Sequence, residues 1–300
     1  MACTGNKTYR PFFLIQVNKL QRILQENRPL IMGVINVTPD SFSDGGCFDT
    51  TEKAIEQVSR LAQEGADILD IGGESTRPGS RSVESDEELS RIMPVIEFAL
   101  NMNIPVSVDT AKPEVMQAAI NAGVVLINDT NALQAPGALE VVADSSVMAC
   151  LMHMQGRPET MQLDPQYSDV VAEVMAFLKQ HVALAVSAGI TRERIIIDPG
   201  FGFGKTLEHN LALLHHLNQF IAMDLPVMAG ISRKSMLGMI TGSPVDNRVY
   251  ASVAAALLAV GQGARIVRVH DVKATRDAFS VFAAMDRIHP GFLIYPSPGQ

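Results

Sequence analysis

Eight short runs of β-branched and other apolar residues recur along the 300-residue chain, and this repetition constrains the fold more than any other feature of the sequence. The runs are Ile31–Ile35, Asp67–Ile71, Pro105–Val108, Val124–Ile127, Val147–Met152, Ile195–Ile197, Pro226–Met228 and Ile266–Val269. The segments between them show helical periodicity, and two of these, residues 51–66 and 113–124, carry near their ends a glycine suited to a helix C-terminus. Apolar strands that alternate with amphipathic helices predict a parallel sheet covered by helices.

Eight strand–helix units in a chain of this length match a (β/α)₈ TIM barrel, and we predict that fold as a single α/β domain. A doubly wound open sheet is the alternative, because topology is hard to infer from one sequence. No Pro-, Gly- or Ser-rich linker and no charge run divides the chain. We expect residues 29–290 to form the barrel, residues 1–28 an N-terminal extension or a closure of the barrel bottom, and residues 291–300 a C-terminal tail.

Composition excludes several classes of function. The net charge is −8, with acidic and basic residues interspersed, which argues against nucleic-acid binding and against a polybasic membrane contact. Cys3, Cys47 and Cys150 make an odd count without a CxxC pair, so neither a disulfide framework nor a thiolate metal site is predicted. The N-terminal residues show no secretory signal, and the longest apolar stretch, Val249–Val260, is too short to span a bilayer. We expect a soluble, cytoplasmic protein.

Polar or charged side chains follow each apolar run at its C-terminal end. They are Asn36; Asp70, Glu74 and Arg77; Asp109; Asn128 and Asp129; His153; Asp198; Ser232 and Lys234; and Arg268 and His270. In a barrel the C-terminal ends of all eight strands meet at one mouth, where such enzymes keep their active sites. We therefore predict a shared ring of polar groups, with the loop after Asn36 as one wall or lid.

Basic residues gather after the seventh and eighth runs, at Arg233, Lys234, Arg268 and His270. Barrels commonly bind phosphate at this position, so we predict a phosphate or pyrophosphate site there. The alternative is that Arg268 pairs with Asp271 or another acid and only holds the rim, since structural ion pairs are common.

Two acidic residues, Asp109 and Asp198, each end an apolar strand and are expected to be desolvated. A buried carboxylate without a protein cation is a ready acceptor for N–H groups of a ligand, and Asn128 adds a donor and an acceptor nearby. This set suits a flat heterocycle with several ring and exocyclic N–H groups. The alternative is that both acids cap the helices that follow their strands.

Signatures of metal sites and of activated nucleophiles are weak. The sequence contains no HExxH motif, no His/Cys cluster and no GxSxG elbow. His153 alone is more typical of a packed, hydrogen-bonded rim residue than of a zinc ligand. His209, His215 and His216 share one predicted helix and are expected to be surface or packing residues.

The segment Asp198–Thr206 is similar to a phosphate loop but fits neither phosphate motif. Pro199 stands where a Walker A motif needs glycine, and Lys205 stands where the third glycine of GxGxxG should be. We interpret its three glycines as a flexible loop that lets Phe201 and Phe203 approach a ligand, with ordinary loop packing as the alternative.

A series of longer motifs resembles the dihydropteroate synthase family. The stretches are MGVINVTPDSFSDGG, LDIGGESTRPGS, VSVDTAKPEV, INDTNAL, LMHMQG, IIIDPGFGFGK, AGISRKSMLG and VRVHDV. They run in order from Met32 to Val272 and so cover nearly the whole chain, which makes the series far more specific than any one motif.

The resemblance implies a barrel that condenses (7,8-dihydropterin-6-yl)methyl diphosphate with 4-aminobenzoate and releases pyrophosphate, in folate biosynthesis. It also implies Mg²⁺ as cofactor, a homodimer, and first and second loops that order over the leaving group. Carried over by motif, the implied site residues are Asp109, Asn128, Asp198 and Lys234 for the pterin; Asn36, Arg268 and His270 for pyrophosphate, with Asn36 on Mg²⁺; and Thr76, Arg77, Phe203 and Ser235 for aminobenzoate. The expected catalytic set is Lys234, Arg268 and Asp109.

The chemistry of these substrates agrees with that assignment. An aryl amine is neutral at pH 7 and already nucleophilic, so no strong general base is needed. The difficult step is departure of pyrophosphate, and we expect SN1-like C–O cleavage. Mg²⁺ and Arg268 would stabilise the leaving group, while a pterin flanked by anionic Asp109 and Asp198 tolerates the developing cation.

Two rival functions remain open at this point. A corrinoid-type methyltransferase barrel also binds a pterin, but SRKS and STRPGS fit the aminobenzoate side and the chain leaves no room for a cobalamin module. A catalytically silent pterin-binding paralogue is the second rival. The presence of Asn36, Asp109, Lys234 and Arg268 argues against it.

Overall fold

The computed structural model describes residues 9–26, 28–38, 47–76, 79, 80 and 82–288. The strands in these segments are β1 (Leu30–Asn36), β2 (Ile68–Gly72), β3 (Val106–Asp109), β4 (Leu126–Asp129), β5 (Met148–Met152), β6 (Ile195–Asp198), β7 (Met228–Ala229) and β8 (Ile266–Val269). All pair in parallel, in the order β6-β5-β4-β3-β2-β1-β8-β7. A parallel bridge between Ile197 and Val227 joins the two edges, so the predicted TIM barrel is confirmed and the open sheet is excluded.

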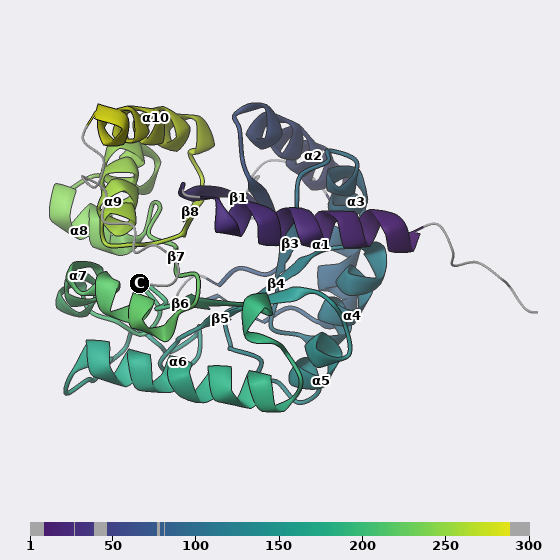
Figure 1. The fold of residues 1–300 in the computed structure, drawn as a ribbon, viewed down its shortest axis with the longest axis horizontal. Helices are drawn as coiled ribbons and strands as arrows, with labels where there is room; N and C mark the ends of the chain where they lie inside the picture. The colour runs from purple at the N-terminus through teal and green to yellow at the C-terminus, as the bar shows by residue number, and fades with distance from the viewer. Residues whose placement is uncertain (1–8, 27, 39–46, 77–78, 81, 289–300) are drawn as a thin grey trace, which may run out of the picture.

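Helices surround the strands on the outside of the barrel (Figure 1). They are α2 (Cys47–Gln63), α3 (Ser85–Leu100), α4 (Pro113–Ala122), α5 (Ala138–Ala143), α6 (Val170–Ser187), α7 (Leu207–His215), α8 (Ser235–Thr241), α9 (Val249–Gly261) and α10 (Val272–Ile288). Their ends follow local sequence rules. Helix α4 begins with Pro113 and stops at Gly123, whose φ of 116° is a left-handed conformation that glycine adopts without strain. Helix α6 is capped by Asp169, whose carboxylate accepts hydrogen bonds from two backbone N–H groups of the first turn.

Strand side chains alternate between two apolar layers. Ile31 and Ile35 of β1 point outward and pack in the main core between sheet and helices, whereas Leu30 and Met32 point into the barrel. The inward positions become polar toward the C-terminal end of the strands. The inward polar residues are Asn36, Asp70, Ser107, Asp109, Asn128, Asp198 and Arg268. This change from apolar to polar builds the mouth on a packed apolar floor.

Helix α1 (Tyr9–Gln25) lies across the opposite end of the barrel, on the side nearest the viewer in Figure 1. Its Val17, Leu20 and Ile23 pack in the same apolar cluster as the inward residues of the strands. The guanidinium of Arg265, one residue before β8, donates to the carbonyl of Leu24 over 2.9 Å. We therefore propose that this helix acts as a closure of the barrel bottom; the tail expected at residues 291–300 lies outside the described residues.

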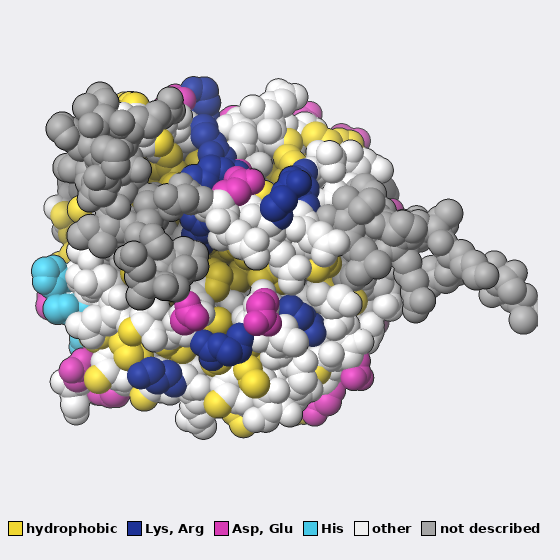
Figure 2. Space-filling model, viewed as in Figure 1, with side chains coloured by type: hydrophobic (Ala, Val, Ile, Leu, Met, Phe, Trp, Pro, Cys, Tyr) yellow, Lys and Arg dark blue, Asp and Glu magenta, His cyan; other side chains and the backbone are white. Residues whose placement is uncertain are grey.

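Of the described helices, α6 is long and apolar enough to cross a membrane by length and composition. Its Val174, Leu178 and Val182 are buried in the main core, so packing against the barrel accounts for this apolar character. The stretch predicted to be too short to span a bilayer forms α9, which has 13 residues. On the face shown in Figure 2, acidic and basic side chains are interspersed, in keeping with the sequence pattern.

Candidate active site

A row of neighbouring residues lines one side of the mouth. In the strand register Asn36 lies beside Gly72, Gly72 beside Asp109, and Asp109 beside Asn128. Because Gly72 has no side chain, the position between Asn36 and Asp109 stays open, and a Cβ there would already touch the Cβ of Asp109 at 3.4 Å. Asp198 ends β6 on the other side, beside Met152. The structure therefore brings Asn36, Asp109, Asn128 and Asp198 to one end of the barrel, as predicted.

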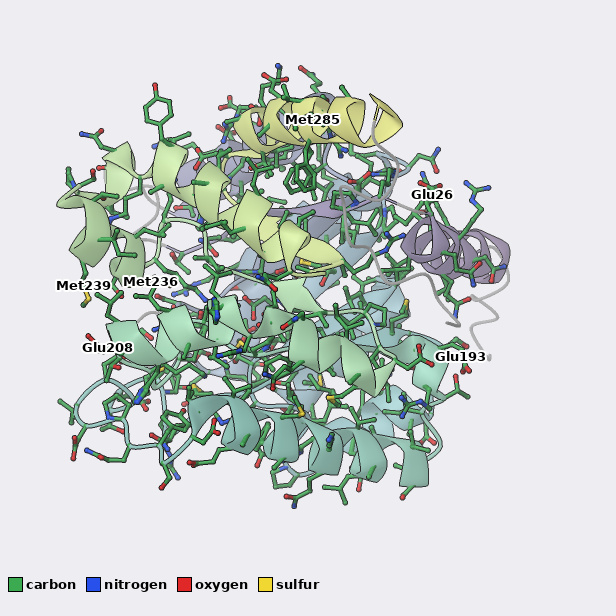
Figure 3. The ribbon with its side chains drawn as sticks, turned by 60° about the vertical axis from the view of Figure 1, so that its left-hand side comes forward. Glu26, Glu193, Glu208, Met236, Met239 and Met285 are labelled. Carbon is green, nitrogen blue, oxygen red and sulfur yellow. The ribbon has the colours of Figure 1, made fainter. Side chains whose placement is uncertain are left out.

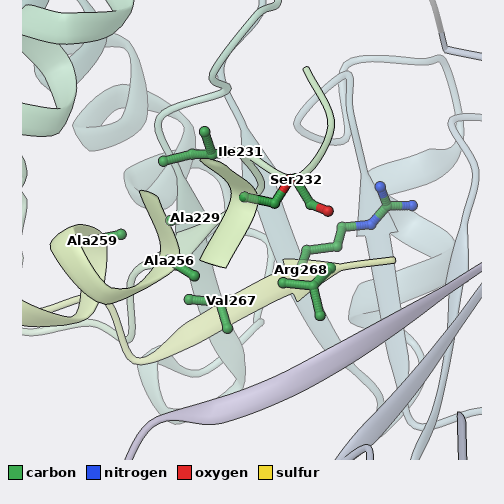
Figure 4. Close-up of a pocket in the computed structure, with 9 residues that line it drawn as sticks. Ala229, Ile231, Ser232, Ala256, Ala259, Val267 and Arg268 are labelled. Carbon is green, nitrogen blue, oxygen red and sulfur yellow. The ribbon is translucent and has the colours of Figure 1, made fainter. Parts of the chain in front are cut away.

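Arg268 extends from β8 into this ring and forms ion pairs with two carboxylates. Its Nε donates to Asp70 Oδ2 over 2.6 Å, and its Nη2 donates to Asp109 Oδ2 over 2.7 Å. Figure 4 shows the guanidinium extending past Ser232 and away from the small apolar side chains of Ala229 and Val267. Five N–H donors are available on a guanidinium, so these two bonds leave donors for a ligand.

Asp70 was predicted to lie in this ring, but the sequence assigned it no role at the site. It is fully buried, and its Oδ2 also accepts a hydrogen bond from Asn128 Nδ2 over 3.0 Å. The only available signal was its place at the end of the second apolar run. Arg268 does pair with acids, as the alternative held, but the partners are Asp70 and Asp109 and not Asp271.

Asp271 is instead the partner of Arg233, with Nε and Nη2 of the guanidinium 3.0 and 2.6 Å from its two carboxylate oxygens. This bidentate pair ties the loop after β7 to the residue that follows His270. Arg233 therefore braces two loops and does not add its charge to the expected phosphate cluster. His270 remains at the mouth, where its Nδ1 lies 3.0 Å from Ser232 Oγ.

Asp198, Lys234 and Phe203 form a second group across the mouth. Asp198 Oδ1 accepts a hydrogen bond from Gly200 N over 2.7 Å. The ammonium of Lys234 donates to the carbonyl of Phe201 and lies 4.5 Å from the centroid of the Phe203 ring, a cation–π distance. A Cβ at Gly230 would lie 3.8 Å from Lys234 Nζ and 3.9 Å from Asp198 Oδ2. The missing side chain at Gly230 keeps the space between these charges open.

Two buried carboxylate oxygens in the ring, Asp70 Oδ1 and Asp109 Oδ1, have no hydrogen-bond partner among the described residues. A buried acceptor left without a donor costs free energy, so such atoms in a mouth mark positions where a ligand supplies the missing donor. Asp109 Oδ1 is therefore a candidate acceptor for an N–H group of a ligand, beside an Oδ2 already held by Arg268.

Burial moves the pKa values of Asp109, Asp198 and Lys234 toward neutrality. The pKa of Asp109 is raised to about 7 by burial, against the opposing effect of Arg268. Burial also raises the pKa of Asp198, which Lys234 opposes. For Lys234, burial lowers the pKa to about 8, although Asp198 favours the charged form. Asp109 and Lys234 therefore change charge within about one pH unit of pH 7–8.

The loop after β6 is packed tightly, which favours the alternative of ordinary loop packing over a flexible loop. Gly200, Gly202 and Gly204 all have positive φ, and a Cβ at Gly200 or Gly204 would overlap a backbone carbonyl of the loop after β5. Phe201 is fully buried in the outer core and does not face the mouth. Phe203 packs with methionines of β5 and its loop, beside Lys234.

The residues expected at the aminobenzoate lie in three separate segments. Thr76 is half-buried in the loop after β2, Phe203 lies in the loop after β6, and Ser235 is exposed as the first residue of α8. Arg77 lies outside the described residues. Within the described contacts, the loop that carries Thr76 approaches the loop after β5, where Gly79 N donates to Pro158 O over 3.1 Å.

A buried ion-pair cluster at the base of the β2 loop was not anticipated from the sequence. Lys112 Nζ donates to Glu74 of this loop and, over 2.5 Å, to Glu88 Oε2 of α3. The Glu88 side chain is 1% exposed, and Arg91 of the same helix donates to the carbonyl of Gly73 over 2.8 Å. The sequence shows only that Lys112 follows Asp109 by three residues, which does not predict its partners.

Within the described residues, no group of three or more His, Cys, Asp or Glu side chains is arranged to hold a metal ion. Mg²⁺ does not require such a group, because it commonly retains several waters and binds one or two protein oxygens together with substrate phosphates. Asn36 presents an amide at the mouth, half-buried, across the open Gly72 position from Asp109. Its chemistry fits a single protein ligand to a phosphate-bound Mg²⁺.

Comparison with known proteins agrees with this geometry. The family described as pterin binding enzyme matches residues 32–270. A dihydropteroate synthase from Haemophilus influenzae is 51% identical over 257 residues, which are 85% of this chain and 94% of that protein. The chain belongs to the dihydropteroate synthase family. The resemblance drawn from the motifs is confirmed, and neither the corrinoid methyltransferase nor the silent paralogue is favoured.

Solved dihydropteroate synthases have the same barrel. One from Xanthomonas albilineans, with 4-aminobenzoic acid, matches with a TM-score of 0.83 and 53% identity, covering 87% of this chain and 94% of that one. Another from the same organism, in complex with 7,8-dihydropteroate, matches with a TM-score of 0.80 and 50% identity over the same shares. This dihydropteroate synthase family member is a transferase of folate biosynthesis, as expected from its motifs.

Proposed function

We propose that this chain condenses (7,8-dihydropterin-6-yl)methyl diphosphate with 4-aminobenzoate to give 7,8-dihydropteroate and pyrophosphate. The observation that carries the proposal is the mouth itself, where the unpartnered Asp109 Oδ1 lies beside the cation Arg268 and opposite Asp198 and Lys234. Such a site accepts N–H groups at one end and an anionic leaving group at the other. Related enzymes have been solved with 4-aminobenzoic acid and with 7,8-dihydropteroate.

The pterin is assigned to the space between Asp109, Asn128, Asp198 and Lys234. The carboxylates accept ring and exocyclic N–H groups, and the Lys234 ammonium donates to a ring nitrogen or oxygen. Asn128 is held by Asp70 through its amide nitrogen, so its amide oxygen is the atom left to accept. The open position at Gly230 gives a flat ring access to Asp198 and Lys234.

Pyrophosphate is assigned to Arg268 and His270, with Asn36 as a ligand of Mg²⁺. When bound, Mg²⁺ would neutralise charge on the leaving phosphate oxygens. Arg268 is fixed by two carboxylates, so its remaining donors are oriented before the substrate arrives, and little reorganisation is needed as negative charge develops. His270 is oriented by the hydroxyl of Ser232.

The reaction is assigned a dissociative course. The C–O bond breaks, and its electron pair leaves with pyrophosphate, where Arg268 meets the growing charge. The resulting cation is delocalised over the pterin and lies near anionic Asp109 and Asp198. The aminobenzoate nitrogen then forms the C–N bond by attack of its lone pair on this cation, and its proton passes to water or to the released pyrophosphate. Thr76, Arg77, Phe203 and Ser235 are assigned to aminobenzoate, with Phe203 as the ring that packs beside it.

The rate should depend on pH in a narrow range. Pterin binding needs Asp109 as carboxylate and Lys234 as ammonium, and their pKa values are about 7 and about 8. We therefore expect kcat/KM for the pterin substrate to fall below pH 7 as Asp109 gains a proton and above pH 8 as Lys234 loses one. Rate–pH profiles check this. Lys234→Met should lower kcat/KM at every pH and keep the acid limb but lose the alkaline limb; an alkaline limb that persists in this variant belongs to the substrate.

Pyrophosphate release by the purified protein tests the proposed reaction directly. The protein is given the dihydropterin pyrophosphate and Mg²⁺, with and without 4-aminobenzoate. Release that requires aminobenzoate and yields dihydropteroate supports the condensation. Binding of the pterin without any release, under both conditions, would contradict it and point to a pterin-binding protein without transferase activity.

A homodimer and a cytoplasmic location are also proposed. Large apolar side chains are exposed on α8, α9 and α10, among them Met239 (66%), Tyr250 (89%), Leu258 and Val281. Figure 3 shows Met239 of α8 at the left edge of the molecule and Met285 of α10 at its top. Several exposed apolar groups on adjacent helices suit burial against a second copy of the chain, which light scattering tests.

The proposal of a cytoplasmic location rests on the composition, with three cysteines and no CxxC pair.

A further inference from the structure

Lys205 is a buried lysine that the reaction described above does not use. It ends the loop that follows β6, and its side chain turns back into this loop, where it is 3% exposed. Its Nζ donates to Gly200 O over 2.8 Å and to Phe203 O over 3.0 Å, and it lies 3.0 Å from His153 Nδ1. Within the described residues it forms no ion pair, so burial of this charge needs another explanation.

The three close partners match the three N–H groups of an ammonium ion. Burial, reinforced by the nearby Lys205, lowers the pKa of His153 to about 3, so its imidazole is neutral at pH 7 and Nδ1 is able to accept a hydrogen bond. Burial also lowers the pKa of Lys205, while Asp198 favours the charged form. A charge that is costly to bury is here satisfied almost entirely by backbone carbonyls of its own loop and by His153.

The direction of those carbonyls determines how the rest of the loop faces the mouth. The carbonyls of Gly200 and Phe203 point to Lys205, whereas the carbonyl between them, on Phe201, accepts from Lys234. The ring of Phe203 lies beside the same Lys234 ammonium. Lys205 and Lys234 thus bind opposite sides of one short loop.

Other buried contacts restrain the same loop. Asn210 Oδ1 accepts from Gly202 N over 2.7 Å, and Tyr167 Oη donates to Gly204 O over 2.8 Å. Gly200 and Gly204 lie so close to the β5 loop that neither has space for a Cβ. A loop held at nearly every peptide group is a rigid support for the two groups that it presents to the mouth.

We propose that Lys205 is a positioning residue for the condensation, which holds residues 199–204 so that the Phe203 ring and the Phe201 carbonyl are set against Lys234. The inference rests on the proposed roles of Phe203 at aminobenzoate and of Lys234 at the pterin. Of the residues assigned to the pterin, Asp109 and Asn128 lie on other strands, whereas Asp198 and Lys234 each share one hydrogen bond with the loop backbone. Loss of Lys205 therefore affects the aminobenzoate side more than the pterin side.

Lys205→Met keeps the length of the side chain and removes the ammonium. We expect KM for 4-aminobenzoate to rise by on the order of 10-fold to 100-fold, the loss typical of a misplaced binding group. The Kd of the pterin alone, measured by calorimetry, should rise by a smaller factor than KM for aminobenzoate, because Asp109 and Asn128 contact the pterin from strands outside this loop. If Lys205 had a purely structural role, the substitution would lower the thermal midpoint, but KM for aminobenzoate and Kd for the pterin would change by the same factor.

Arg194→Met is the matched control. Arg194 precedes β6 at the other end of the barrel, and its guanidinium also donates to two backbone carbonyls, Val147 O and Val142 O, each over 2.8 Å. It should lower the thermal midpoint without changing KM for aminobenzoate. An unchanged KM in folded Lys205→Met, or an equal rise in Arg194→Met, would overturn the inference.

If Lys205→Met does not fold, Asn210→Ala tests the same loop without removing a buried charge. It frees Gly202 N and should raise KM for aminobenzoate by a larger factor than the Kd of the pterin; equal effects on both substrates would overturn the inference. Failure of the proposed reaction is distinguishable from failure of this inference. In the first case the unaltered chain itself would release no pyrophosphate in response to aminobenzoate.

Discussion

Arg268→Ala should lower kcat by on the order of 10²–10³, the loss typical of removing one donor aimed at charge that develops in the transition state. The guanidinium is held by Asp70 and Asp109 before substrate binds, so its contribution comes without reorganisation. Steady-state kinetics at saturating substrates measure the effect. Near-normal kcat would remove Arg268 from the leaving-group site and return it to a purely structural ion pair.

The same substitution should also lower the free energy of unfolding, and this effect must be separated from catalysis. Asp70 is fully buried and would be left without its cation, a change that typically costs about 3–5 kcal/mol. Arg268→Lys is the control, because it keeps a positive charge but loses the planar fork that meets two carboxylates at once. We expect Arg268→Lys to retain more stability than Arg268→Ala while its kcat stays low. Equal losses of stability in both variants would contradict this separation.

Lys112→Met should lower the free energy of unfolding by about 3–5 kcal/mol, because it leaves Glu88 buried without a cation. The side chain of Glu88 is 1% exposed, and its Oε1 has no hydrogen-bond partner among the described residues. Its buried negative charge is therefore balanced mainly by the Lys112 ammonium. Glu74 would lose its partner too, which releases the base of the β2 loop. Urea unfolding measures this change in stability. KM for aminobenzoate should also rise, because Thr76, which is assigned to aminobenzoate, lies two residues after Glu74 in the same loop.

Lys273→Met is the matched control for that experiment. Lys273 pairs with Asp277 on α10, but both side chains are more than 60% exposed. Exposed pairs contribute about 0–1 kcal/mol, so we expect a change in this range at most. If both lysine substitutions had the same small effect, the Lys112 cluster would not be a significant source of stability.

The barrel could be predicted from the sequence because its signal is repeated eight times. Each apolar run overlaps a strand, and polar residues at several strand ends, such as Asn36 and Asp198, reached the mouth. The end of a helix could also be predicted, since Gly123 adopts the left-handed conformation that ends α4. Short-range sequence patterns of this kind are enough to predict the architecture of a parallel barrel.

Side-chain partners were not predictable, because they depend on geometry between strands. Arg268 and Asp70 are 198 residues apart, and β1 separates their strands in the sheet. The sequence therefore placed both at the mouth without showing that they meet. Lys112 and Lys205 were missed for another reason: lysines in loops usually face solvent, and no spacing rule marks the exceptions. The assigned substrate roles of individual residues remain predictions that the experiments above test.

The ion pairs of Arg268 have a consequence for how the protein assembles. Two carboxylates on the second and third strands depend on a cation from the last strand of the barrel. A chain that emerges from the ribosome therefore carries an uncompensated pair of acids until β8 arrives, and these acids favour water over the interior. Closure of the barrel and completion of the active site thus become one event.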